Sequence, residues 1–136
     1  MGIAKGQFNE ILNGIFKAGN TIKLYSSMPD EETEAGGVII GGNNTTKIYK
    51  IDSGDFTTGN GTAQSAKNMM MYLCETQGGD GTAVGFGVFG GTNLLYFGQF
   101  STPMNIDYNT VPTIKRYDEA KGEGVKITMT STDVSA

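Results

Sequence analysis

The feature that most constrains the fold is the regular interruption of the chain by glycine-rich turns. Clusters of glycine with asparagine, aspartate or threonine follow one short apolar run after another, at residues 54, 59–61, 78–81, 90–93 and 122–124. Segments this short can form strands joined by hairpins, but they are too short for helices. The spacing therefore predicts an all-β fold, an antiparallel β-sandwich of jelly-roll-like type, rather than a parallel sheet.

The composition agrees with a turn-rich β-protein. Glycine contributes 21 of the 136 residues, and charged residues make up only 18%. A chain of this length fits one domain and can bury a hydrophobic core without disulfide bonds. Its longest apolar runs are far shorter than the ~20 residues of a membrane-spanning helix. The first six residues carry no long apolar segment. We therefore expect a soluble protein with no membrane partner and no secretory signal.

One segment near the N-terminus has the period of a short amphipathic helix. Its apolar residues recur at the i, i+3, i+4, i+7 and i+8 positions, and they are Phe8, Ile11, Leu12, Ile15 and Phe16. Gly19 and Asn20 then favour the end of the helix. We expect residues 1–20 to form an N-terminal helix and docking segment, and residues 21–136 to form a single β-sandwich domain.

Apolar runs predict the strands. The first strand begins at Thr21, where Ile22 and Leu24 alternate with polar neighbours, and it ends before Met28. Later strands are expected at residues 47–51, 68–75, 84–89, 94–100, 111–117 and 125–130.

The segments 84–89 and 94–100 predict a hairpin joined by four turn residues. Apolar residues occupy nearly every position of both arms, so we expect both faces to be covered. The hairpin should lie in the middle of the fold or against a neighbouring subunit. Gly85, Gly87 and Gly98 would let another backbone or an aromatic ring approach closely.

Three consecutive methionines at residues 69–71 belong to another expected strand. Met70 alternates with Tyr72, which favours a place for Met70 in the core. Met69 and Met71 would then lie on the opposite face, where a subunit interface is an option.

Residues able to carry out chemistry are scarce. The chain has no histidine, and its single cysteine, Cys74, lies in an apolar run. The nominal carboxylate pairs, Asp52 with Asp55 and Glu75 with Asp80, lie at glycine-rich turns where solvated aspartates are usual. We therefore expect no enzyme, no cofactor and no catalytic residue.

Binding motifs are equally weak. The G-x-G-x-x-G match at 85–90 lies within an expected strand, so it does not predict a nucleotide site. A net charge of −4 gives no electrostatic footprint for nucleic acid. The acidic segment 30–34 reads as an exposed loop. We expect no metal site, although a bound cation at this loop is left open.

The order of these features resembles that of small bacteriophage tail-fibre or head-decoration structural proteins. The segment from Phe86 to Pro103 carries the closest resemblance, followed by a closing strand from Val125 to Met129. The residues that match the family pattern in the first segment are Gly87, Val88, Phe89, Asn93, Leu94, Leu95, Tyr96, Gly98, Thr102 and Pro103.

This resemblance implies a virion structural protein, assembled in the host bacterial cytoplasm. It would be a self-associating capsid decoration, an auxiliary or head-fibre protein, or a fibre module. Its partners would be copies of itself, with a trimer favoured, and the major capsid protein or other virion proteins. The residues expected at such interfaces are Phe8, Ile11, Leu12, Ile15, Phe16, Met69, Met71, Phe86 and Phe97.

The alternative function is a tail-tip receptor-binding module that recognises carbohydrate on the host surface. Tyrosine side chains can stack on sugar rings, and asparagine-rich loops near residues 43–44 and at Asn60 can form hydrogen bonds with hydroxyl groups. The tyrosines are Tyr25, Tyr49, Tyr72, Tyr96, Tyr108 and Tyr117.

Overall fold

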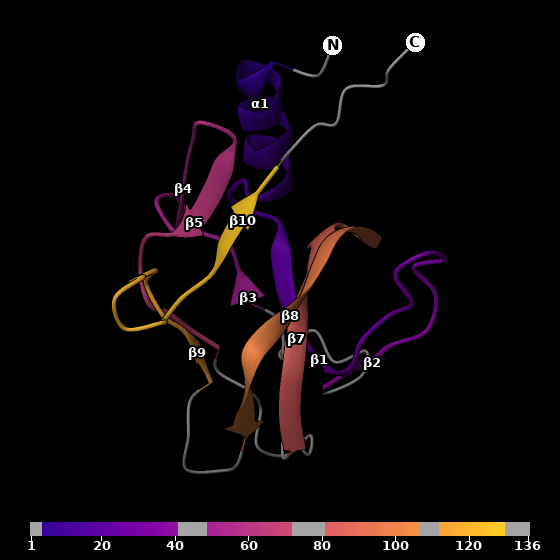
Figure 1. Cartoon of the computed structure of the whole chain (residues 1–136). Coiled ribbons are helices and arrows are strands. Elements are labelled where there is room, and N and C mark those ends of the chain that lie inside the picture. The colour runs from indigo at the N-terminus through magenta and orange to yellow at the C-terminus, as the bar shows by residue number, and fades with distance from the viewer. Residues whose placement is uncertain (1–3, 41–48, 72–80, 107–111, 130–136) are drawn as a thin grey trace, which may run out of the picture.

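The protein is presented here as a computed structural model, which describes residues 4–40, 49–71, 81–106 and 112–129 (Figure 1). One short helix precedes strands that pair in antiparallel sheets. This confirms an all-β fold with one short helix, whereas the jelly-roll arrangement is not confirmed. The elements are α1 (Lys5–Ile15), β1 (Thr21–Ser27), β2 (Val38–Ile39), β3 (Tyr49–Lys50), β4 (Phe56–Gly59), β5 (Thr62–Ser65), β6 (Met69–Met70), β7 (Gly81–Gly90), β8 (Asn93–Ile106), β9 (Thr113–Ile114) and β10 (Lys126–Thr128).

The strands form three antiparallel sheets around one hydrophobic core. The largest sheet has the order β2-β1-β7-β8, with β3 also paired to β1, and the smaller sheets are β10-β5-β4 and β6-β9. In Figure 1, β4 and β5 lie at the upper left and β7 and β8 near the centre of the view, with β10 between them. The core cluster draws side chains from all three sheets and from the helix.

The predicted hairpin is confirmed, and it is longer than expected. β7 lies between β1 and β8, and the ladder closes at the pair Gly90 and Asn93. Gly91 has a φ of 62°, a left-handed conformation that glycine adopts without strain. The turn therefore spans two residues instead of four.

β1 and β7 bury apolar side chains on both faces of the largest sheet, as the sequence indicated for the first arm of the hairpin. The second arm, β8, is not covered on both faces, since Leu95 is 41% exposed. Ile22, Leu24 and Val88 lie in the main core, whereas Tyr25 and Phe89 are buried outside that cluster. Tyr25 lies over Gly87, because a methyl group placed on that glycine would come within 2.7 Å of the tyrosine ring. The prediction that a glycine here admits an aromatic ring is confirmed for Gly87.

The helix packs into the same core as the sheets. Phe8, Leu12 and Phe16 are buried, and the ring of Phe16 lies 4.4 Å from that of Phe56 between centroids. Beyond the helix, the Asn20 side-chain amide donates hydrogen bonds to the carbonyl oxygens of the last turn, which stops the helix where the sequence indicated. No helix in the described residues is long and apolar enough to span a membrane.

The remaining strand predictions hold in part. The expected strands at 47–51, 68–75, 111–117 and 125–130 correspond to the shorter β3, β6, β9 and β10. Residues 47–48, 72–75, 111 and 130 of these predictions lie outside the described residues. Two features were not predicted, namely β2 and the hairpin of β4 with β5.

The methionine assignment is wrong. Met69 and Met71 are buried in the core, whereas Met70 is 47% exposed. The cause is the pairing of β6 with β9, in which Met69 lies opposite the buried Ile114 and shares its inward face. Successive side chains of a strand alternate, so Met70 faces outward.

Candidate functional site

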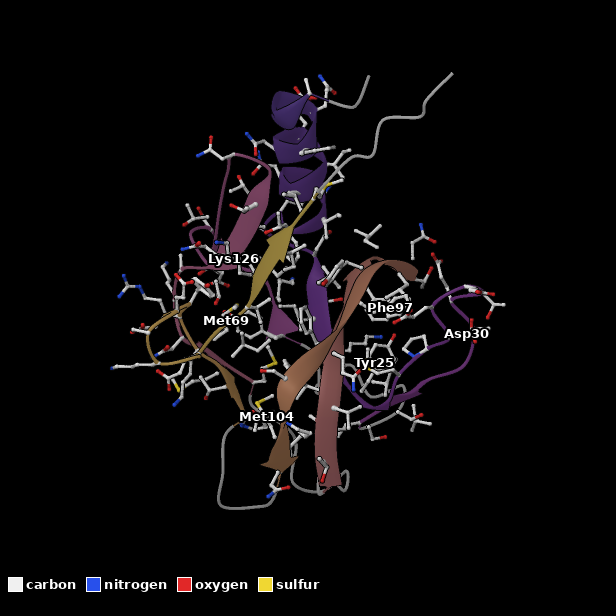
Figure 2. All side chains as sticks on the ribbon, viewed as in Figure 1. Tyr25, Asp30, Met69, Phe97, Met104 and Lys126 are labelled. Carbon is white, nitrogen blue, oxygen red and sulfur yellow. The ribbon has the colours of Figure 1, made fainter. Side chains whose placement is uncertain are left out.

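A groove of about 530 Å³ lies between the edge strand β8 and the segment that leads from β9 to β10. One wall is β8 from Gly98 to Met104, and the other is formed by residues 113–115 and 122–127. In Figure 2, Met104 and Lys126 mark these two walls. The groove thus lies where the largest sheet meets the two smaller ones.

The floor of the groove is aromatic. Phe86 stacks on Phe100 with ring centroids 5.6 Å apart, and its ring lies 5.8 Å from that of Tyr96. The Tyr96 hydroxyl is neutral at physiological pH at the ordinary pKa of tyrosine, and burial raises this pKa further. The floor can therefore hold apolar or planar groups but supplies no charge.

The second wall carries the charged groups. Lys115 Nζ lies 2.6 Å from Glu123 Oε2, and this hydrogen bond lowers the pKa of the Glu123 carboxyl. Lys126 extends over the ring of Tyr117, with Nζ 5.6 Å from the ring centroid. The residues that line the groove include two lysines and one glutamate, so the lining is net positive.

Ser65 positions this second wall, a role that the sequence reading missed. Its hydroxyl donates a hydrogen bond to the carbonyl oxygen of Lys115 and accepts one from the N–H of Val125. The backbone carbonyl oxygen of Ser65 also accepts a hydrogen bond from the N–H of Tyr117. One fully buried serine therefore joins both ends of the segment between β9 and β10.

The first wall is an irregular strand edge. Two register shifts interrupt the ladder of β8 with β7, one near Phe89 and one between Ala83 and Gly85. Within the described residues, β8 pairs only with β7. Its other edge has no strand partner there and borders the groove. Bulges bend a strand and redirect its side chains, which opens the space beside the edge.

Most of the side chains predicted for an interface are buried within this chain. The helix residues Ile11 and Ile15 are exposed and half-buried respectively, and Phe97 is half-buried on β8. The remaining six are buried in the protein's own interior, and the interface assignment is corrected for five of them, namely Phe8, Leu12, Phe16, Met69 and Met71. The sixth, Phe86, is also buried, but its ring forms part of the groove floor.

The tyrosines considered for stacking on sugars are spread over the fold. Tyr25 is buried, Tyr96 lies in the groove floor, and Tyr117 is half-buried against Lys126. The Tyr49 hydroxyl donates a hydrogen bond of 2.7 Å to Asp55. Tyr72, Tyr108 and the loop at 43–44 lie outside the described residues. The described tyrosines form no shared platform for a sugar.

The Asp55 side chain holds local structure through its hydrogen bonds. It is buried, and its carboxylate accepts hydrogen bonds from the Tyr49 hydroxyl and from the N–H of Asp52 at 2.8 Å. The hydrogen bond between Asp52 and Asp55 is thus made by the Asp52 backbone. Glu75, Asp80 and Cys74 lie outside the described residues.

The first residue of the acidic loop, Asp30, holds the loop in a turn. The Asp30 carboxylate accepts hydrogen bonds from the N–H groups of Glu32 and Thr33 at 2.8 and 2.9 Å. Among the described residues, no group of three potential ligands from histidine, cysteine, aspartate and glutamate is close enough to hold a metal ion.

No family model, no curated protein and no solved structure matches this chain. What the groove can hold is therefore inferred from its own residues. An aromatic floor, a net positive wall and an unpaired strand edge are suited to binding a segment of polypeptide.

Proposed function

We propose that the protein is a structural subunit of a bacteriophage virion, a self-associating capsid decoration or fibre module without enzymatic activity. The observation that carries this proposal is the groove beside β8. This strand is fourteen residues long, contains no charged residue and has an edge without a strand partner in the described part of the chain. An exposed strand edge can bind another chain, although a register shift and Pro103 interrupt part of this one.

The chemistry of the groove supports docking rather than catalysis. Its strongest polar contact is the ion pair of Lys115 with Glu123, in which each charged group offsets the other. Tyr96 is neutral at physiological pH, as any tyrosine is at its ordinary pKa, and burial raises its pKa further. An activated nucleophile needs a base beside it, and no such pair lines this groove. The groove can bind and position a partner, and this binding is the proposed function of the groove.

The virion setting is supported by the resemblance of residues 86–103 to small phage structural proteins. In this fold, that segment is the end of β7, its turn and most of β8. The resembling residues thus include the wall and part of the floor of the groove. The proposed partners are copies of this chain and the major capsid protein or another virion protein.

The test is labelling of intact particles from the source phage with gold-conjugated antibody against this protein, viewed by electron microscopy. Label spread over the capsid supports a decoration role, and label along a fibre supports a fibre module. Absence of label from purified particles, with the protein detected in the same infected cells, contradicts the proposal.

Binding of host carbohydrate at a tail tip has weaker support. Within the described residues, the tyrosines that it needs are buried, hydrogen-bonded or spread over separate parts of the fold. Label confined to the tail tip, together with binding on a glycan array, would nevertheless favour this alternative over the decoration role.

A further inference from the structure

A rigid acidic turn projects from the side of the molecule opposite the groove wall. Residues 30–38 are all exposed, and Figure 2 shows Asp30 and Lys126 at opposite sides of the fold. The turn is held by the Asp30 carboxylate and by the backbone hydrogen bond from Glu34 N–H to the Asp30 carbonyl oxygen. A turn that is already ordered loses little conformational entropy when it binds.

The glutamates of this turn have no cation beside them in the described structure. Glu31, Glu32 and Glu34 are exposed, and none of them belongs to an ion pair among the described residues. The hydrogen bonds that fix the turn use the side chains of Asp30 and Thr33 instead. The three glutamate carboxylates are therefore available to a partner.

The groove presents the opposite charge. Lys115 and Lys126 line it, and Lys121 lies close enough to help lower the pKa of Glu123. Glu123 is the one acidic residue in the lining, and it is already bound to Lys115. Asp118, Glu119 and Lys121 lie in the adjacent turn and do not line the groove. Lys126 thus remains in the lining to attract an anionic segment, and Lys121 adds a positive charge next to the lining residue Gly122.

We propose that the acidic turn of one copy, residues 30–34, docks in the groove of the next copy, with Glu31 and Glu32 near Lys121 and Lys126. This inference rests on the proposed self-association and specifies its geometry. The two contacting surfaces are different and lie on opposite sides, so the association is head-to-tail. Contacts of this kind close into rings, such as a trimer, when the rotation between copies permits.

The charge distribution favours this geometry over a two-fold contact. The chain has a net charge of −4, so two copies repel each other at long range. A two-fold contact through the turn would bring two sets of glutamates together, and one through the groove would bring the lysines together. A reciprocal two-fold contact, in which each copy's turn enters the other copy's groove, would also pair opposite charges, but it needs both surfaces at one interface, whereas Asp30 and Lys126 lie on different sides of the fold in Figure 2.

The experiment uses the full chain and two charge-reversal variants, E31K/E32K in the turn and K121E/K126E in the groove. Light scattering after size-exclusion chromatography and sedimentation equilibrium would measure assembly at low and at high salt. We expect the wild type to associate and to weaken as salt rises. Each variant alone should associate at least about tenfold more weakly, because a favourable contact becomes repulsive.

Charge restoration makes the test specific. Mixing the two variants should restore the contact between unlike copies, in dimers or in even-numbered assemblies in which the two species alternate, because a ring of three cannot alternate. The variant that combines all four substitutions has an unchanged net charge and should assemble by itself as the wild type does. K17E/K50E, which alters two exposed lysines away from the groove, is the matched control for K121E/K126E and should leave assembly intact.

Two results would overturn the inference. One is a wild type that remains monomeric at every concentration, and the other is assembly that the turn and groove variants do not change. A monomeric wild type would also remove self-association from the proposed function, but neither result removes the role in the virion if particles still carry the gold label. Unlabelled particles contradict the proposed function whatever the oligomeric state, so the two failures can be told apart.

Discussion

The Ser65 hydroxyl donates a hydrogen bond of 2.7 Å to the carbonyl oxygen of Lys115, fifty residues further along the chain. The Ser65 hydroxyl oxygen also accepts a hydrogen bond of 3.1 Å from the N–H of Val125, and Ser65 is completely buried. A side chain of β5 thus fixes the distance between the two ends of the segment that forms one wall of the groove. The shape of the groove depends on a residue that does not line it.

Replacing Ser65 with alanine should destabilise the protein by about 1–3 kcal/mol, because the partly buried carbonyl of Lys115 and N–H of Val125 each lose a hydrogen-bond partner. Urea unfolding followed by circular dichroism measures this change. Ser53→Ala is the matched control, since Ser53 is exposed and its hydroxyl makes no hydrogen bond to a described residue. Equal stability of the two variants would contradict the role of Ser65.

The close approach of Tyr25 to Gly87 leads to a second prediction. A methyl group on Gly87 would lie 2.7 Å from the tyrosine ring and 3.0 Å from the ring of Phe89, so Gly87→Ala should cost about 1–3 kcal/mol through overpacking. Gly14→Ala is the control, and it should change the free energy of unfolding in the opposite direction. Gly14 lies in the helix with nothing within 4 Å of the added methyl, so alanine should stabilise the protein by about 0.5–1 kcal/mol.

The β7–β8 hairpin could be predicted because its signals are local. Glycines mark the turn, and the apolar residues of β7 indicate that both of its faces are covered. The hairpin of β4 and β5 was missed because its arms are polar, and only Ala63 and Ser65 of β5 are buried. The sequence Asn60–Gly61 between the arms is a strong hairpin signal and could have revealed it.

The groove could not be predicted from local patterns. Its two walls come from β8 and from a segment that is joined to the fold through Ser65, and nothing near residue 65 marks it as a partner of residues 115 and 125. The orientation of Met69 was also decided by a distant strand, because its facing follows from the pairing with Ile114. In the sequence, the alternation of Met70 with Tyr72 suggested that Met70 faces the core and that Met69 lies on the opposite face.

The helix offers a prediction that separates core residues from surface residues. Phe16 is 5% exposed and contacts Phe56, so Phe16→Ala should destabilise the protein by about 3–5 kcal/mol. Ile11 is 43% exposed, and Ile11→Ala should change stability by less than about 1 kcal/mol. Thermal unfolding measures both. A large loss in the Ile11 variant would show that this face is covered, for instance in an assembled state.

The same position tests the expected docking role of the helix. Ile11→Asp should leave the monomer folded because the side chain already faces solvent. If the helix inserts between subunits, this substitution should reduce assembly in sedimentation experiments. Assembly equal to that of the wild type would confine the contacts to other surfaces, such as the acidic turn and the groove.

The buried contact of Tyr49 with Asp55 predicts a loss of stability at high pH. Burial raises the pKa of Tyr49 above its ordinary value, and the hydrogen bond to Asp55 raises it further. The folded state therefore holds the phenolic proton more tightly than the unfolded state, whose tyrosine titrates near pH 10. The stabilisation is fully present below that pH and is lost as the pH rises through the folded pKa.

Chemical unfolding measured at intervals above pH 9 would test this dependence. Tyr49→Phe should be less stable than the wild type at neutral pH, because the Asp55 carboxylate loses its 2.7 Å donor. The variant should also lose stability less steeply at high pH. Burial raises the pKa of Tyr25 and Tyr96 as well, so part of the slope should remain. A slope identical to that of the wild type would mean that Tyr49 ionises equally in the folded and unfolded chains.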